Sequence, residues 1–484
     1  MELETVIGLE THIQLRTRTK LFCGCSIAFG AAPNTQTCPV CLGLPGAMPV
    51  VNRLAVEKSI AAGLVLNSLI NPVVRFDRKN YYYPDLPKNY QTSQFDLPVC
   101  VGGGIDIETA GGLKRIRLVR AHLEEDAGKL NHDEVNPGGD TRVDLNRAGT
   151  PLLEIVTEPD IRSPEEAVAY LLRLKKLIEY QDISDCEMAQ GSLRCDVNIS
   201  LRPVGQTTLN TRTEIKNLNS FNFIDKAIRA EVKRQVRLYE TGEPVRQATC
   251  LYDVARDETR VMRFKEDAHD YRYFPEPDLP PIRISDEWIK EIRGRLAELP
   301  EARYERYRAA YGLSDYDAKQ LTTYRAWGDY YEAMLANGCA PSDAANWFIN
   351  DLIKYSSDKY LAGLNLIPAA ISELIKKVAD KTIQRNPARL EILPRMMEKG
   401  MTLADAAKDA GIELTSGGVS RDAIRTHLLA AMASNPKAVE QYRAGQKDNT
   451  KWFIGQIMRP TKRQASVEAI QAVINEELGE FKPQ

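Results

Sequence analysis

The sequence lacks any hydrophobic run that approaches the length of a membrane span. A transmembrane helix needs about 18 or more consecutive apolar residues, and no stretch of the 484 residues contains them. The chain starts with Met1-Glu-Leu-Glu4, which is acidic where a secretory or transit peptide would be basic. We therefore expect a cytoplasmic protein with no membrane-embedded part.

Strong net charge and the common nucleotide-binding motifs are also absent. A formal net charge of −2 argues against a protein that wraps nucleic acid, although it is compatible with a local basic patch. There is no G-x-x-x-x-G-K-[ST] phosphate loop, no G-x-G-x-x-G turn and no G-x-S-x-G nucleophile elbow, and the histidines form no H-E-x-x-H motif. A nucleotide would therefore be held by metal ions and strand residues.

The nine cysteines are an odd number, which fits a reducing compartment better than a disulfide framework. Four of them lie close together in the sequence, as Cys23-Gly-Cys25 and Cys38-Pro-Val-Cys41, with 12 residues between the pairs. This spacing lets two chelating turns close on one tetrahedral Zn²⁺. An iron–sulfur cluster and free thiols are the alternatives. Because the cysteines follow a strand-like segment and precede Pro-rich loops, we expect a structural site and not a catalytic one.

Four strand-like segments each place acids on one face and apolar residues on the other, since successive side chains of a strand alternate. The polar positions are Glu10 and His12 in residues 5–15, Glu124 and Glu125 at the end of 117–125, Asp196 and Asn198 in 192–200, and Glu214 and Lys216 in 211–217. Each segment alone could be a solvated strand. Together they favour a sheet whose polar face binds Mg²⁺ and a nucleotide, because hard divalent cations prefer oxygen ligands. Glu124 and Glu125, as neighbours, should point to opposite faces.

The texture of the sequence changes after the Pro-rich segment that ends at Pro281. Residues 1–285 contain short β-type runs and turn dipeptides, which predicts an α+β domain. Residues 286–412 and a small module at 413–484, after the break at Ser416-Gly-Gly418, are amphipathic and predict helices. The expected helices begin at Ser163-Pro164 and cover 222–240, 286–299, 318–336, 341–355, 368–379 and 387–399, with three more from Arg421, Pro436 and Trp452 to the end.

The acidic segments belong to a set of motifs that resembles the GatB/GatE family, the B subunits of the tRNA-dependent amidotransferase GatCAB, over nearly the whole chain. These motifs are Val6-Ile-Gly-Leu-Glu-Thr-His-Ile-Gln-Leu15, residues 76–96 with Lys79-Asn-Tyr-Tyr-Tyr-Pro-Asp85, His122-Leu-Glu-Glu-Asp-Ala-Gly-Lys129, Val143-Asp-Leu-Asn-Arg-Ala-Gly-Thr-Pro-Leu152, Gly191-Ser-Leu-Arg-Cys-Asp-Val-Asn198, Glu214-Ile-Lys-Asn-Leu-Asn-Ser-Phe221 and Asp270-Tyr-Arg-Tyr-Phe-Pro-Glu-Pro-Asp278.

The resemblance implies a cradle-shaped domain with antiparallel or mixed sheets, akin to glutamine synthetase and guanido kinases, over residues 1–285. A helical domain and a YqeY-like tail that contacts tRNA would follow. It also implies an ATP-dependent carbon–nitrogen ligase that amidates Glu or Asp misattached to tRNA(Gln) or tRNA(Asn). The ammonia would come from glutamine through the A subunit, in a heterotrimer with A and C subunits.

The resemblance also assigns roles to individual residues. It makes Glu10, His12 and Glu125 the metal ligands, with Glu124, Asp196 and Glu214 in a supporting shell or a second metal site. Phosphate contacts are expected from four basic residues: Lys79, Arg147, Lys216 and Arg272. Lys79 stands before three tyrosines, a pattern that suits base stacking but that packing alone would also explain.

Two departures from the family pattern limit what can be carried over. The family usually reads Gln-Glu-Thr-Arg where this chain has Gln247-Ala-Thr-Cys250, and Arg459-Pro-Thr-Lys-Arg-Gln-Ala465 lacks the usual glycine after the basic pair. The alternative function is a non-catalytic, zinc-stabilised scaffold that binds tRNA. The acidic strands argue against it, because carboxylates on the binding face would repel phosphates.

Overall fold

The computed structural model describes residues 2–131, 140–264, 271–356, 358–412, 414, 419–461 and 464–483. Its internal contacts divide the chain into two units, Met1–Ala297 and Glu298–Gln484. Helix α4 (Asp286–Arg295) therefore belongs to the first unit, whereas the Pro-rich boundary placed it in the second. The reason is that α4 packs on α1 (Arg53–Val65), where Trp288 donates a hydrogen bond to Glu57 (3.2 Å).

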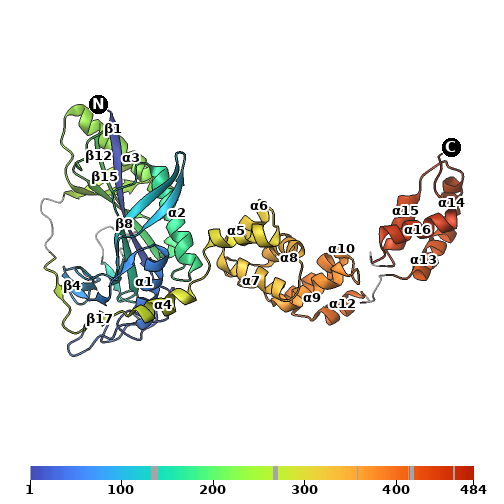
Figure 1. The fold of residues 1–484 in the computed structure, drawn as a ribbon, viewed down its shortest axis with the longest axis horizontal. Helices are drawn as coiled ribbons and strands as arrows, with labels where there is room; N and C mark the ends of the chain where they lie inside the picture. The colour runs from blue at the N-terminus through green and yellow to red at the C-terminus, as the bar shows by residue number, and fades with distance from the viewer. Residues whose placement is uncertain are drawn as a thin grey trace. The chain divides into compact units, whose positions relative to one another are not determined.

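The first unit is built on a ten-stranded mixed sheet (Figure 1). Its path is β15-β14-β13-β12-β1-β11-β8-β6-β2, with β7 paired to β8, and among these strands only β13 and β14 run parallel. The strands are β1 (Leu3–Gln14), β2 (Leu69–Ile70), β6 (Cys100–Val101), β7 (Gly104–Thr109), β8 (Gly112–Glu125), β11 (Pro151–Thr157), β12 (Leu193–Pro203), β13 (Thr213–Leu218), β14 (Ala248–Asp253) and β15 (Glu258–Phe264). The predicted mixture of helices and a mixed sheet is confirmed.

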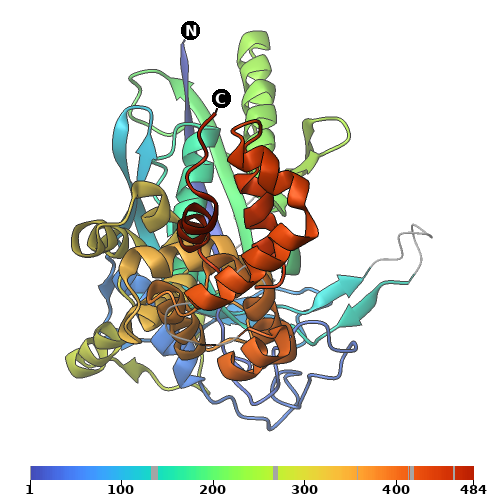
Figure 2. The ribbon, with the colours of Figure 1, turned by 90° about the vertical axis from the view of Figure 1, so that its right-hand side faces the viewer.

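Smaller sheets complete this unit. Strands β4 (Asp77–Asn80), β5 (Tyr90–Ser93) and β16 (Phe274–Pro275) form a three-stranded sheet, and β3 (Val73–Val74) pairs with β17 (Ile282–Arg283). Strands β9 (Lys129–Asn131) and β10 (Arg142–Asp144) form a ribbon that projects from the unit (Figure 2). The three-stranded sheet packs against the end of β8, where Leu123 N donates to Gln94 Oε1 (3.0 Å).

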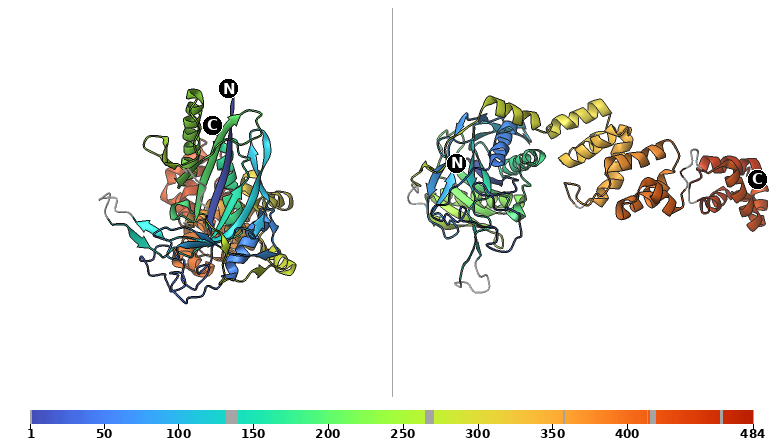
Figure 3. Two further views of the ribbon diagram at one scale, coloured as in Figure 1. Left: turned by 90° about the vertical axis from the view of Figure 1, so that its left-hand side faces the viewer. Right: turned by 90° about the horizontal axis from the view of Figure 1, so that it is seen from below.

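Helices α2 (Pro164–Tyr180) and α3 (Phe221–Thr241) cover the apolar face of the large sheet (Figure 3). Both predicted helix starts are confirmed: Ser163 accepts a hydrogen bond from Glu166 N (3.2 Å), and Ser220 accepts one from Phe223 N (3.1 Å). Such N-caps satisfy amides that have no partner within the helix. Because these helices take the apolar face, the acidic face of the sheet is left for other contacts.

One carboxylate lies inside the contact between α3 and the sheet. Glu231 is fully buried and accepts hydrogen bonds from Thr213 Oγ1 (2.7 Å), Thr259 Oγ1 (2.7 Å) and Gln235 Nε2 (2.9 Å), besides an ion pair with Arg234 (2.6 Å). Burial by itself would raise the pKa of Glu231, but these donors outweigh it and lower the pKa. The folded protein therefore favours the ionised carboxylate.

We expect Glu231→Gln to lower the free energy of unfolding by about 2–3 kcal/mol at pH 7, because an amide NH₂ would face hydrogen-bond donors. A carboxyl with a lowered pKa stabilises the fold above its ordinary pKa of 4.5, and this contribution is lost as the pH falls further. The difference from the wild type should thus shrink between pH 5 and about pH 3. Denaturant titrations measure it, with the exposed Glu240→Gln as control. A difference that does not change with pH would contradict this account.

The second unit is helical. Its helices before residue 413 are α5 (Pro300–Tyr311), α6 (Asp315–Leu321), α7 (Arg325–Ala336), α8 (Pro341–Trp347), α9 (Pro368–Ala379), α10 (Arg385–Pro387), α11 (Leu393–Lys399) and α12 (Leu403–Ala410), with π-helical turns at Phe348–Leu352 and Ala388–Ile392 and a 3₁₀ turn at Ile353–Tyr355. The prediction of one helix over 318–336 is wrong, since it breaks at the β-branched pair Thr322-Thr323. The prediction of helix to residue 299 is also too long, because α4 ends at Arg295.

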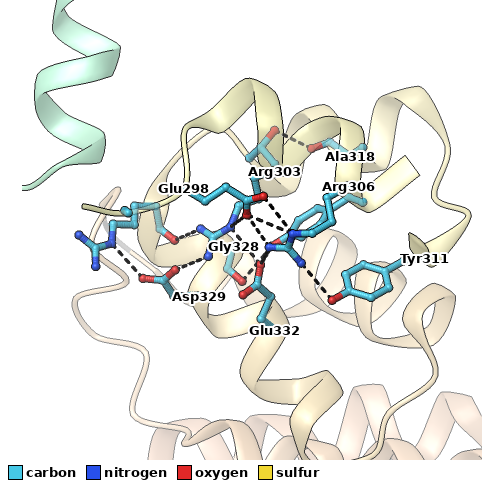
Figure 4. Close-up of polar contacts among 12 residues, drawn as sticks. Glu298, Arg303, Arg306, Tyr311, Ala318, Gly328, Asp329 and Glu332 are labelled. Carbon is cyan, nitrogen blue, oxygen red and sulfur yellow. Dashed lines mark hydrogen bonds and ion pairs between the residues drawn. The ribbon is translucent and has the colours of Figure 1, made fainter. Parts of the chain in front are cut away.

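Helix α5 was not predicted because polar side chains occupy its buried face. Arg303 is 7% exposed and pairs with Asp329 (2.6 Å) and Glu332 (3.0 Å) of α7. Arg306 pairs with Glu298 and Glu332, both at 2.6 Å (Figure 4). This network fastens the first residue of the unit to α5 and α7, and no apolar periodicity announces it.

The tail has its own hydrophobic core, which includes Ile424, Leu428, Phe453 and Ile470. Within residues 419–461 and 464–483 the structure has α13 (Arg421–Ser434), α14 (Pro436–Arg443), α15 (Thr450–Met458) and α16 (Val467–Leu478). The prediction of three helices is wrong, because the last one ends before Pro460 and a new helix begins after the N-cap Ser466. The expected break at Ser416-Gly-Gly418 lies outside the described residues.

Among the helices of the described residues, none is both long enough and apolar enough to cross a membrane.

Candidate active site and metal centres

Strand β1 carries the centre of the acidic face. Its burial alternates as predicted, with Leu9 and Ile13 fully buried under the helices and Glu10 and His12 half-buried on the other face. Glu10 lies opposite Asp196 of β12, whereas His12 lies opposite Glu154 of β11. The two neighbours of β1 therefore draw Glu10 and His12 into two different groups.

The first group is a carboxylate triad of Glu10, Asp196 and Glu214. One oxygen from each lies within 4.8 Å of the others. Asn198 Nδ2 donates to Glu10 Oε1 (3.1 Å), and Lys216 forms ion pairs with Asp196 and with Glu214 (3.2 Å). Burial raises the pKa of Glu10, and the nearby carboxylates raise it further. The triad thus holds more negative charge than Lys216 balances.

The second group consists of His12, Glu124 and Glu154, whose ligand atoms also lie within 4.8 Å of one another. His12 Nε2 is 3.6 Å from Glu124 and 3.4 Å from Glu154. His122 Nε2 faces the same two carboxylates at 3.6 and 3.3 Å. Burial would lower the pKa of His122, but Glu154 and Glu124 outweigh it and raise the pKa to about 9.

The structure does not gather Glu10, His12 and Glu125 into one ligand set. The expected divergence of Glu124 and Glu125 is present: Glu124 accepts from Ser93 Oγ (3.2 Å) within the second group, while Glu125 pairs with Lys88 and accepts from Thr92 N (2.8 Å). Glu125 lines a cavity of about 200 Å³ that also borders Cys23 and Cys41. Its place at the end of β8, against the three-stranded sheet, explains the separation.

The four predicted phosphate contacts occupy different surroundings. Lys79 lies over the rings of Tyr81 (5.8 Å) and Tyr271 (5.0 Å), and the field of Glu124 raises its pKa although burial opposes this. Arg147 is engaged by the protein itself, with hydrogen bonds to the carbonyls of residues 127 and 128 and an ion pair with Asp126 (3.4 Å). Lys216 lies in the first group, and Arg272 is exposed.

Sequence reasoning missed Glu154, His122 and Arg194. Glu154 had a signal, since Pro151–Thr157 repeats the pattern of one acid among apolar residues. Arg194 pairs through Nη2 with Asp126 (2.8 Å), lies opposite His12 in the sheet and leaves its buried Nε without a partner. No pattern identified Arg194, because its position follows from the pairing of β12 with β1.

The four cysteines expected to bind zinc are close together in space. The sulfur atoms of Cys23, Cys25, Cys38 and Cys41 lie within 4.8 Å of one another. Cys38 N donates to Cys41 Sγ (3.1 Å), as expected for a chelating turn, and Gly43 closes this turn with φ +66°. The pKa of the Cys41 thiol is lowered to about 4, chiefly by the Cys23 thiol and also by the nearby Lys20 ammonium. Four convergent thiols, one of which readily becomes a thiolate, are compatible with a structural zinc site.

Five strands thus deliver two oxygen-rich groups to one face of a sheet. Each group carries net negative charge that protein cations balance only in part. Oxygen-rich sites of this kind suit Mg²⁺ and the phosphates that Mg²⁺ bridges. The arrangement is therefore suited to bringing anionic reactants together.

Comparison with known proteins gives consistent matches. The family model described as the GatB/GatE catalytic domain matches residues 5–290, and one described as the GatB domain matches residues 329–478. A protein of Thermodesulfovibrio yellowstonii is 46% identical over 477 residues, 98% of this chain and 99% of its own. Proteins of Geobacter sulfurreducens and Desulfotalea psychrophila are each 48% identical, covering 98% and 99% of this chain and 98% and 100% of their own. All three carry the name of the B subunit of aspartyl/glutamyl-tRNA(Asn/Gln) amidotransferase.

Proposed function

Because the chain belongs to the GatB/GatE family, we propose that it is the B subunit of an amidotransferase that converts Glu-tRNA(Gln) or Asp-tRNA(Asn) into Gln-tRNA(Gln) or Asn-tRNA(Asn). The observation that supports catalysis by this chain is the pair of acidic groups on the face of the sheet opposite α2 and α3. A scaffold that only presented tRNA would have no use for carboxylates there, because they repel phosphates.

The chemistry proposed for this face is the activation of the side-chain carboxylate. A carboxylate is a poor electrophile, so the γ-phosphoryl group of ATP is first transferred to one of its oxygens, which gives an acyl phosphate and ADP. Ammonia then attacks the carbonyl carbon, the C–O bond to phosphate breaks, and phosphate leaves with the electron pair. The nitrogen loses a proton as the amide forms.

Two sets of residues fit Mg²⁺. The triad of Glu10, Asp196 and Glu214 offers only carboxylate oxygens, and His12, Glu124 and Glu154 offer a second set. Bound Mg²⁺ would neutralise phosphate charge while ATP and the substrate carboxylate approach each other. Glu125 is excluded from these sets by its pairing with Lys88.

Three basic residues of the chain would orient the anions. Lys79 and Arg194 border the second group, and Lys216 borders the first. We propose phosphate or carboxylate contacts for these three. Arg147 is better suited to holding its loop, because its donors are directed at protein oxygens.

The partners follow from the names of the relatives and from the family. The relatives are named as subunits, and the family obtains ammonia from an A subunit that is assembled with a C subunit. We propose the same heterotrimer here, with the four-cysteine cluster holding one structural Zn²⁺.

The test is reconstitution with the A and C subunits. ATP hydrolysis and amide formation should both require misacylated Glu-tRNA(Gln) or Asp-tRNA(Asn), and correctly charged Glu-tRNA should not support them. Amide formation that does not depend on ATP would overturn the activation step. ATP turnover without dependence on misacylated tRNA would overturn the substrate assignment.

We further propose that the tail, residues 413–484, contributes to tRNA binding. Lys447, Lys451 and Arg459 are described residues in or beside α15, and Lys462 and Arg463 lie outside the described residues. Cationic side chains gathered on a chain of near-neutral charge are suited to phosphate contacts.

Ending the chain after residue 412 should raise KM for charged tRNA about tenfold or more, because phosphate contacts supply most of the electrostatic binding. The rest of the second unit keeps its own hydrophobic core, so the truncated protein should fold and bind ATP with Mg²⁺ as before. Steady-state kinetics and ATP titration measure the two effects. An unchanged KM would refute a role for the tail in tRNA binding.

A further inference from the structure

The four-cysteine cluster has one buried cation beside it. Lys20 is 0% exposed, which is rare for a lysine unless its ammonium group has partners. Its Nζ lies 3.5 Å from Cys41 Sγ and 3.3 Å from the carbonyl oxygen of Leu145. One ammonium group therefore contacts a candidate zinc ligand and the backbone of a distant loop at the same time.

The loop that Lys20 reaches, residues 144–150, is tied to the cysteine segment at further points. Leu21 N donates to Gly149 O (2.8 Å), and Leu145 N donates to Asn34 Oδ1 (2.8 Å). Gly149 has φ +86°, and a Cβ there would lie 3.4 Å from Lys20 Cδ and 3.6 Å from Cys41 Cβ. The lysine stem therefore fills the space between the loop and the cluster.

The same loop continues toward the acidic face of the sheet. Gly149 N donates to Asp126 O and Asp126 N donates to Thr150 O, both at 2.8 Å. The Asp126 carboxylate accepts from Arg194 Nη2 at 2.8 Å, and Arg194 lies opposite His12. A continuous set of contacts thus leads from the cysteine cluster to the second acidic group.

We propose that Lys20 is a positioning residue that couples the four-cysteine cluster to the loop of residues 144–150. The inference depends on the zinc site proposed above. Four thiolates around Zn²⁺ carry a net charge of −2, and a buried anion of this kind requires a nearby cation or hydrogen-bond donors. Lys20 supplies the cation at Cys41, and its second hydrogen bond transmits the rigidity of the metal site to the loop.

The test measures metal release and loop opening in the full-length chain. Lys20→Met keeps most of the side-chain volume but removes the charge and both hydrogen bonds. Zinc transfer to a chromogenic chelator should become about tenfold faster or more, the effect usual for losing a residue that contacts a metal ligand. Hydrogen exchange at the amides of residues 143–149 should accelerate in the same variant. In the cobalt-substituted protein the sulfur-to-metal charge-transfer band should shift, since Cys41 loses a hydrogen bond.

Lys58→Met is the matched control. Lys58 is also largely buried, on α1, but its ammonium donates to the carbonyl of Asp182 and not to the cluster. This variant should release zinc at the wild-type rate. If both variants accelerated release equally, a general loss of stability would explain the result and the proposal would be wrong.

The wild-type protein provides a second measurement that does not require the variant to fold. Removing zinc with the chelator should accelerate exchange at residues 143–149, and unchanged protection there would overturn the coupling. Unchanged zinc release from Lys20→Met would overturn the role of Lys20 itself. Because amidation is not measured, these outcomes are independent of whether the proposed amidotransferase activity is correct.

Discussion

Replacing Glu124 with Gln is expected to reduce the formation of amidated tRNA by about a thousandfold or more. Glu124 is 2% exposed, and its carboxylate faces both His12 and His122 at 3.6 Å. The amide keeps the size of the side chain but removes one charge from the second acidic group. A site that stabilises phosphoryl transfer by several kcal/mol loses a comparable part of its rate when a ligand charge is lost.

The position of this defect in the reaction can be established by changing the nitrogen source. Ammonium supplied in place of glutamine should not restore activity, because carboxylate activation precedes nitrogen delivery. Binding of tRNA should change little, and glutamine hydrolysis by the partner should persist at its uncoupled level. Glu108→Gln, at an exposed position on β7 of the same sheet, is the control and should be fully active. Recovery with ammonium would assign Glu124 to ammonia transfer and refute its role in activation.

Replacing Cys41 with Ser is expected to remove the bound zinc, about one equivalent per chain, and to lower the unfolding temperature by about 10 °C. Cys41 is the most buried of the four clustered cysteines and is the one that contacts Lys20. Structural zinc stabilises the folded state because a preformed site is absent from the unfolded chain, and a loss of about 3 kcal/mol corresponds to a shift of this size.

Metal analysis of protein purified without added zinc, together with calorimetry, measures both effects. Cys250→Ser is the matched control, since Cys250 is buried in the same unit but lies on β14, outside the cluster. This control should retain its metal. A wild-type protein with metal content near zero would refute the zinc site, and loss of zinc without loss of stability would show that the site does not support the fold.

Local periodicity predicted much of what the structure contains. The alternation of residues 5–15 placed Glu10 and His12 on one face, and the Ser-Pro and Ser-Phe starts of α2 and α3 were recognised from capping chemistry. The cysteine spacing predicted a cluster, because two short chelating turns bring their sulfurs together by local geometry. These features depend on residues that are near one another in the sequence.

The predictions that failed concern helices whose signal is not apolar. Helix α5 buries Arg303 and Tyr307, whose polar ends meet Glu332 of α7, so that no hydrophobic stripe marks it. The tail was read as three helices because the apolar pattern continues past Pro460. In both cases the partners that decide the structure come from another segment.

By itself the sequence determined which side chains share a face of a strand, where the main helices of the first unit begin and which cysteines converge. The tertiary structure alone decided which acids meet. Glu154 joins His12, and Asp196 joins Glu10, because β11 and β12 flank β1 although they are distant in the chain. Glu125, adjacent to Glu124 in sequence, is separated from both groups by Lys88. The physical reason is that strand periodicity is a local property, whereas strand order and register follow from burying the apolar face of the whole sheet under α2 and α3.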